Sequence, residues 1–218
     1  LAGVFLAGGV LSAAAQTTLT LTHSSPADSH FGVAATAFKE VAEEQSGGTL
    51  NVVIQRLDNE REALESVQFG AQECAMGSAG PLGNFVPETR VLDIPFLFDD
   101  YQHARGVLDS EIGQDLLDLF PGRGLYGVVW MENGFRNLSE LPSALQQGTV
   151  DGQENPIPVI LSNNLDMMQK HLYLTRHVYS PGILVCNPDF IAGLTDEQKA
   201  AVEDAGKAAS AANRARVE

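Results

Sequence analysis

Hydrophobic and polar positions in the first part of the chain follow strand and helix periods in turn. Residues 17–22 alternate Thr with Leu, which is the period-two pattern of a strand, and residues 29–46 carry apolar side chains at helical spacing before a pair of glycines. A second strand is predicted over residues 50–54. Asn59 is expected to cap a helix that follows it and ends before a further glycine. The order predicted is strand, helix, strand, helix.

The middle of the chain continues this alternation. A short strand is predicted over residues 74–76, and an apolar strand and turn over residues 91–98. Helices are expected over residues 101–108 and 111–119, before another strand over 125–130. Strands that alternate with helices over short connections are typical of an α/β fold with a largely parallel sheet.

The last part of the chain is predicted to mix short helices with extended segments. The expected elements are a helix over residues 141–147, a polar loop over 150–156, a helix over 157–170 and extended segments over 172–174, 177–179 and 182–186. Thr195 and Gln198 then form a capping box, which predicts a long helix from Asp196 to Glu218.

The first 15 residues have the character of a secretory signal. Residues 1–11 are apolar and rich in Gly and Ala, and a run of alanines before Gln16 fits a small-residue cleavage site. We expect residues 1–15 to be the remainder of a signal peptide, so that the mature chain begins near Gln16 in the periplasm. The apolar run is shorter than the roughly 20 residues of a membrane-spanning helix. No direct membrane insertion is therefore expected after cleavage.

The charge balance excludes some partners. The net charge is -15, with 28 Asp and Glu against 13 Lys and Arg, so no nucleic-acid partner is expected. An anionic ligand would need a few directed donors to overcome this background. The sequence predicts no metal, no cofactor and no enzyme, because it contains no nucleophile elbow, metal-ligand pair or phosphate-binding loop, and its five histidines are scattered.

The two cysteines, Cys74 and Cys186, each lie in an apolar, strand-like segment. An oxidising compartment would allow a disulfide between them. Cysteine is also among the most buried residue types as a free thiol. We interpret them as two buried free thiols, with the disulfide as the alternative.

Several segments together resemble one family. They are residues 84–88 (NFVPE), 92–98 (LDIPFLF), 132–136 (ENGFR), 144–156 (ALQQGTVDGQENP) and 177–181 (HVYSP). In this order they are similar to segments of the solute-binding proteins of tripartite ATP-independent periplasmic (TRAP) transporters, of the DctP-like type. The resemblance extends over nearly all of the expected mature chain.

The resemblance implies an α/β fold of two lobes, with mixed sheets flanked by helices and a long hinge helix that begins at Asp196. Residues 16–131 would form lobe I, residues 132–181 lobe II, and residues 182–218 the return to lobe I with the start of the hinge helix. It also implies that the lobes close on a small carboxylate ligand, which is then passed to a membrane permease.

The chain departs from the family pattern between Ser139 and Glu140. There the family carries a few dozen further residues, including a strand with the arginine that clamps the ligand carboxylate, and a second family arginine has no clear counterpart either. Lobe II is therefore expected to be incomplete. Two alternatives to a transporting protein follow: a relic or incomplete fragment that does not transport, and an extracytoplasmic ligand-sensing domain.

Arg136 and Asn155 are the candidate ligand contacts in the later part of the chain. Arg136 can form paired hydrogen bonds to a carboxylate, but it can equally be a structural partner of Glu132 or Glu154. Asn155 matches a family residue whose amide reaches the ligand, and its alternative role is a turn before proline. Glu154 and Asp151 are expected to brace this loop.

Three candidates come from the first lobe. His23 and Ser24 follow the first predicted strand, and Ser78 follows the third. Open α/β sheets bind ligands at the carboxyl ends of their strands, so these side chains are expected to contact the ligand. Hydrogen bonding within their own loops is the alternative.

Overall fold

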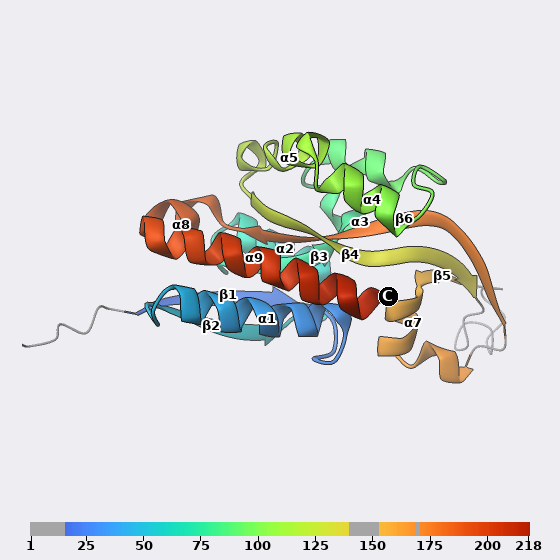
Figure 1. The fold of residues 1–218 in the computed structure, drawn as a ribbon, viewed down its shortest axis with the longest axis horizontal. Coiled ribbons are helices and arrows are strands. Elements are labelled where there is room, and N and C mark those ends of the chain that lie inside the picture. The colour runs from blue at the N-terminus through green and yellow to red at the C-terminus, as the bar shows by residue number, and fades with distance from the viewer. Residues whose placement is uncertain (1–15, 140–152, 169–170) are drawn as a thin grey trace, which may run out of the picture.

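The computed structural model describes residues 16–139, 153–168 and 171–218 (Figure 1). The signal expected over residues 1–15 and the helix expected over residues 141–147 lie outside the described residues, as does Asp151.

The described strands form one sheet with the order β2-β1-β3-β6-β4-β5. They are β1 (Thr17–His23), β2 (Leu50–Arg56), β3 (Cys74–Ser78), β4 (Tyr126–Ser139), β5 (Gln153–Pro156) and β6 (Leu172–Cys186). β1 is parallel to β2 and β3, because helical crossovers join these strands, whereas β6 is antiparallel to β3 and β4, and β4 to β5. The mixed sheet implied by the resemblance is confirmed. The largely parallel sheet predicted from the pattern is correct only for β1, β2 and β3.

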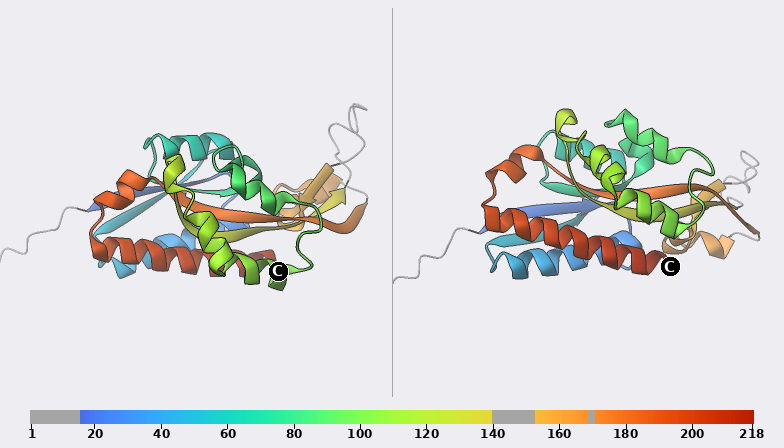
Figure 2. Two further views of the ribbon diagram at one scale, coloured as in Figure 1. Left: turned by 90° about the horizontal axis from the view of Figure 1, so that it is seen from above. Right: turned by 45° about the horizontal axis from the view of Figure 1, so that its top comes forward.

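Helices cover both faces of the sheet (Figures 1 and 2). The α-helices are α1 (His30–Gln45), α2 (Glu60–Gln68), α3 (Ala79–Leu82), α4 (Tyr101–Leu108), α5 (Glu111–Leu117), α7 (Ile157–Ser162), α8 (Pro188–Gly193) and α9 (Asp196–Val217). The 3-10 helices within the described residues are η1 (Pro87–Asp93), η2 (Pro121–Arg123) and η3 (Leu165–Met168). The predicted Asn59 cap and the Thr195–Gln198 capping box are confirmed. In both caps the decisive hydrogen bonds are local.

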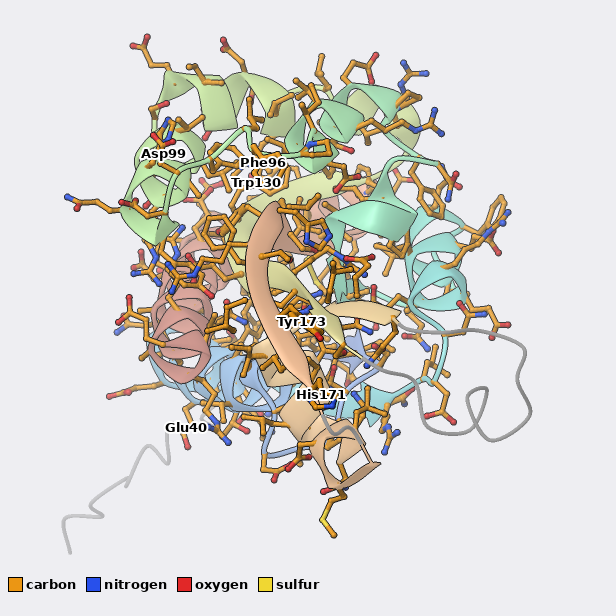
Figure 3. All side chains as sticks on the ribbon, turned by 90° about the vertical axis from the view of Figure 1, so that its right-hand side faces the viewer. Glu40, Phe96, Asp99, Trp130, His171 and Tyr173 are labelled. Carbon is orange, nitrogen blue, oxygen red and sulfur yellow. A yellow bond between two sulfur atoms is a disulfide. The ribbon has the colours of Figure 1, made fainter. Side chains whose placement is uncertain are left out.

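The sheet separates two hydrophobic cores. Alternate residues of a strand point to opposite faces, so Leu184 packs with α1, α8 and α9, whereas Ile183 packs with α2, α3, α4 and α5. Trp130, labelled in Figure 3, is 2% exposed and belongs to the second core. Not every apolar side chain is covered. Phe96 is 72% exposed, and Tyr173 on the first part of β6 is 61% exposed (Figure 3).

Some predicted elements differ from the structure. The strand predicted within residues 91–98 is wrong, because η1 runs to Asp93 and is followed by a turn. Pro95 has no N–H to extend a ladder, and Phe96 has φ of 59°. The helix expected over residues 157–170 is interrupted after Ser162, where Asn164 takes φ of 54° before η3.

The strands of the later part are longer than predicted. β4 extends to Ser139 instead of ending near residue 130, and residues 153–156 of the expected polar loop form β5, paired with the end of β4. The three extended segments expected after residue 171 form one strand, β6, which pairs with β4 through register shifts. Each difference depends on a partner strand distant in sequence.

The cysteines form a disulfide, so the interpretation as free thiols is wrong. β3 and β6 are antiparallel neighbours, and Cys74 lies directly opposite Cys186 in their register. The Cα atoms are 4.0 Å apart, and neither residue is exposed. The bond joins residues 112 positions apart in the sequence.

A buried ion pair anchors β4 where it leaves the first part of the sheet. Glu132 is 0% exposed, and its two carboxylate oxygens accept hydrogen bonds from Arg105 Nε at 2.6 Å and Arg105 Nη2 at 2.8 Å. The Tyr179 hydroxyl lies 3.2 Å from Oε1, and Asn213 Oδ1 accepts from the Glu132 backbone N–H at 2.6 Å. The carboxylate raises the pKa of Arg105. Glu132 thereby ties α4, β4, β6 and α9 together.

Candidate functional site

One mostly polar pocket lies at the carboxyl ends of β1 and β3. Its volume is about 260 Å³, and it is lined by Ser24, Ser25, Phe31, Asp58, Glu60, Ser78, Asn133, Arg136, Asn155, Val159 and Asn163. The crossover from β1 leads to β2 on one side of β1, and the next leads to β3 on the other side. This change of direction is the topological switch point at which open α/β sheets bind ligands. β5 and α7 lie beyond these strand ends (Figure 1).

The pocket brings together four of the five predicted contacts: Ser24, Ser78, Arg136 and Asn155. His23 does not line it, and its side chain is buried at 3% exposure. Burial lowers the pKa of His23, because desolvation penalises the charged imidazolium.

A larger hollow of about 630 Å³ between α5, β4 and α9 is less suited to an anion. Its charged lining residues are Lys207, Asp109, Glu111 and Glu203, so three carboxylates face one amine. The pocket at the strand ends contains two carboxylates, Asp58 and Glu60, but it also contains Arg136 and several amide and hydroxyl groups, and it lies at the switch point of the sheet. We therefore take it as the candidate site.

Ser24 and Ser78 are both bound to Glu60. The Ser24 hydroxyl donates to Glu60 Oε1 at 3.2 Å, and the Ser78 hydroxyl donates to Oε2 at 2.6 Å. The Ser78 backbone N–H donates to the same Oε2 at 3.1 Å. Glu60 was not among the site residues predicted from the sequence. Its place at the start of α2, just after the carboxyl end of β2, was a signal that could have pointed to it.

Arg136 is paired with Glu154, which is one of the structural roles considered for it. Arg136 Nε binds Glu154 Oε2, Nη2 donates to Oε1 at 2.7 Å, and Nη2 also donates to the Glu154 carbonyl at 3.0 Å. His177 Nε2 lies 3.3 Å from Glu154 Oε2. Glu154 thus braces β5, as expected. Among the described residues, Arg136 Nη1 has no hydrogen-bond partner, although Arg136 lines the pocket.

Asn133 is a second pocket residue that the sequence analysis missed. His30 Nε2 lies 2.8 Å from Asn133 Oδ1, so the ring holds the oxygen end of this amide. Within the described part of the chain, the amide nitrogen of Asn133 has no hydrogen-bond partner. Asn155 is held differently, since its amide nitrogen donates to Gln153 Oε1 at 2.6 Å. Asn133 is therefore a donor available to a ligand.

Burial of His30 should make stability depend on pH. His30 is 1% exposed, and burial lowers its pKa to about 4. The unfolded chain, with a histidine pKa near 6.5, therefore binds more protons between about pH 6.5 and pH 4. The free energy of unfolding should fall across this window as pH is lowered, by up to about 3 kcal/mol from His30. Urea denaturation at several pH values measures this.

The matched variants for this test are His30→Gln and His171→Gln. Glutamine can still donate to Asn133 but does not titrate, so His30→Gln should flatten the pH dependence. His171 is exposed, and its replacement should leave the slope unchanged. Equal slopes in wild type and His30→Gln would contradict the assignment.

Comparison with known proteins decides the family. The sequence model of the DctP family, described as bacterial extracellular solute-binding protein, family 7, matches residues 21–142 and 137–218. The chain belongs to this family. A solute-binding protein of Verminephrobacter eiseniae is 40% identical over an alignment that covers 95% of this chain and 75% of the relative.

Two solved structures share the fold of this DctP protein, and both are TRAP periplasmic solute-binding proteins. One, from Bordetella bronchispeptica, has density assigned to pantoate, is 39% identical and has a TM-score of 0.88 over 93% of this chain and 82% of that chain. The other, from Polaromonas sp. JS666, is bound to D-erythronate, is 41% identical and has a TM-score of 0.87 over the same shares. The two-lobed α/β fold class implied by the resemblance is confirmed.

Relatives contain residues that have no counterpart in this chain. The two matched parts of the family model meet at residues 137–142, which include the Ser139–Glu140 junction. The alignment with the Verminephrobacter protein is 252 residues long, although it covers only 95% of the 218 residues here. It therefore contains positions of the relative that have no counterpart in this DctP protein. Among the described residues, no helix combines the length and apolar character needed to cross a bilayer.

Proposed function

We propose that this DctP protein captures a small hydroxylated organic acid in the periplasm and delivers it to the membrane permease of a TRAP transporter, without catalysing a reaction. The observation that carries the proposal is the pocket at the switch point of the sheet, where Arg136 and Asn133 each have a donor that no other described residue binds. Such directed donors can hold a carboxylate on a chain with a net charge of -15.

The ligands of the two similar structures support the choice of acid. Pantoate and D-erythronate are both monocarboxylic acids that carry hydroxyl groups beside the carboxylate and at the far end of a short carbon chain. A polar pocket of about 260 Å³ has the size and character for a compact acid of this kind.

The division into lobes is part of the proposal. Residues 16–131 and 182–218 would form lobe I with the start of the hinge helix, and residues 132–181 would form lobe II. In support, pocket residues come from both parts: Ser24 and Ser78 from the first, Arg136 and Asn155 from the second. A ligand that contacts both parts would favour the closed arrangement of the lobes, because only that arrangement offers every contact.

The shortening at residues 137–142 favours a second candidate function, a family member that has lost ligand capture. The resemblance places the clamp arginine of the family in the segment that is missing. In the remaining Arg136, Nε and Nη2 already form hydrogen bonds to the Glu154 carboxylate. A relic of this kind would bind no organic acid.

Isothermal titration calorimetry with D-erythronate and pantoate separates the two candidates. We expect wild type to bind one of these acids, and Asn155→Ala to weaken that binding about tenfold through loss of a polar contact. The melting temperature of the empty protein should change little, because the one side-chain hydrogen bond of Asn155 among the described residues is to the nearby Gln153.

Asn84→Ala is the control for this measurement, since Asn84 is exposed and lies outside the pocket. It should bind the acid as wild type does. Failure of wild type to bind either acid would favour the relic. Unchanged affinity in Asn155→Ala would remove Asn155 from the site.

A further inference from the structure

We infer that the pocket selects a monocarboxylic hydroxy acid and rejects a second carboxylate, with Glu60 as the residue that determines this specificity. The inference rests on the proposed function and adds the class of acid that is excluded. It is carried by the hydrogen bonds among Ser24, Glu60 and Ser78. We call these three residues the acceptor wall.

The hydroxyl protons of the acceptor wall are already used. A serine hydroxyl has one proton to donate, and those of Ser24 and Ser78 both go to Glu60, at 3.2 Å and 2.6 Å. Neither serine can therefore donate to a ligand while these bonds are kept. What the two hydroxyls still offer to the pocket is oxygen lone pairs.

Glu60 itself offers only acceptors. Both of its oxygens accept hydrogen bonds, one at Oε1 and two at Oε2 when the Ser78 backbone N–H is included. A carboxylate has about four lone-pair sites, which leaves one on Oε1. That site, together with the serine oxygens, can accept from ligand hydroxyls. Asp58 adds a further carboxylate to the pocket lining.

Two donors of the pocket lie on β4, which does not contribute to the acceptor wall. Asn133 and Arg136 both line the pocket, and each has a side-chain nitrogen with no hydrogen-bond partner among the described residues. One ligand carboxylate can accept hydrogen bonds from these two nitrogens. A second carboxylate at the acceptor wall would meet oxygens without protons and the charge of Glu60, so it would lose its hydration without new hydrogen bonds. A hydroxyl at the same place donates to Oε1.

The test uses two acids that differ at one end only. In meso-tartrate the terminal hydroxymethyl group of D-erythronate is replaced by a carboxylate. Calorimetry on wild type should give a dissociation constant for D-erythronate at least about tenfold below that for meso-tartrate. Glu60→Gln removes the charge and supplies an N–H donor, so the ratio of the two constants should fall to about one or reverse.

Glu62→Gln is the matched control, because it removes the same charge from the same turn of α2 at an exposed position outside the pocket. It should keep the ratio of wild type. Similar affinity of wild type for both acids, or an unchanged ratio in Glu60→Gln, overturns the inference while acid binding itself still supports the proposed function. If wild type binds neither these two acids nor pantoate, the proposed function and the inference both fail. The wild-type ratio is decisive even if Glu60→Gln does not fold.

Discussion

Replacing Cys74 and Cys186 together with alanine is expected to lower the free energy of unfolding by about 4–5 kcal/mol. The bond closes a loop between residues 112 positions apart, and a loop of this length removes a large amount of conformational entropy from the unfolded chain. Both residues are fully buried between β3 and β6, so the native protein should also resist reduction. Urea denaturation of the oxidised wild type and the double variant measures the difference.

Reduced wild-type protein, denatured and refolded in the presence of a thiol reductant, is the control. It keeps both sulfur atoms in the core and should be destabilised by a similar amount. Titration of thiols in denaturant should find none without reductant and both after reduction. Two reactive thiols in the unreduced, denatured protein would show that the bond does not form.

Glu132→Gln is expected to destabilise the protein by about 2 kcal/mol or more, because it removes the charge-assisted hydrogen bonds between Arg105 and a fully buried carboxylate and leaves Glu218 as the acidic partner of Arg105. Glu132 is 0% exposed and binds Arg105 through both oxygens, at 2.6 Å and 2.8 Å. The same carboxylate lies 3.2 Å from the Tyr179 hydroxyl. Loss of the charge should therefore loosen α4 and β6 as well as β4. Chemical denaturation of the empty protein measures this.

Glu65→Gln provides the comparison, since Glu65 forms an exposed ion pair with Arg61 within α2. Exposed pairs of this kind contribute about 1 kcal/mol or less. Similar losses of stability in the two variants would contradict a special role for the buried pair.

The elements that could be predicted from the sequence are those with local causes. Asn59 caps α2 and Thr195 caps α9 through hydrogen bonds to residues two or three positions away, and both caps are visible as residue types in the sequence. β5 could not be predicted in this way. Three of its four residues are polar, and they form a strand because the end of β4 pairs with them. The sequence could not favour the disulfide over its alternative, free thiols, for the same reason, since the bond depends on the register of β3 against β6.

The features of the candidate site also divide into those with a local signal in the sequence and those that depend on distant residues. Ser24 and Ser78 were expected near a ligand because they follow strands, and the structure places both in the pocket. Their link through Glu60 spans 36 and 18 positions of the sequence and has no local signature. The contact between Asn133 and His30 spans 103 positions. Which protons remain free for a ligand depends on such long-range pairs, so this could be determined only from the folded chain.

The bond between Cys74 and Cys186 also has a consequence for proteolysis. It encloses β4, β5 and most of β6, which are the elements proposed to reach lobe II. A single protease cut anywhere between the two cysteines therefore yields fragments that stay covalently linked. Such nicked protein migrates as separate bands only after a reductant has been added.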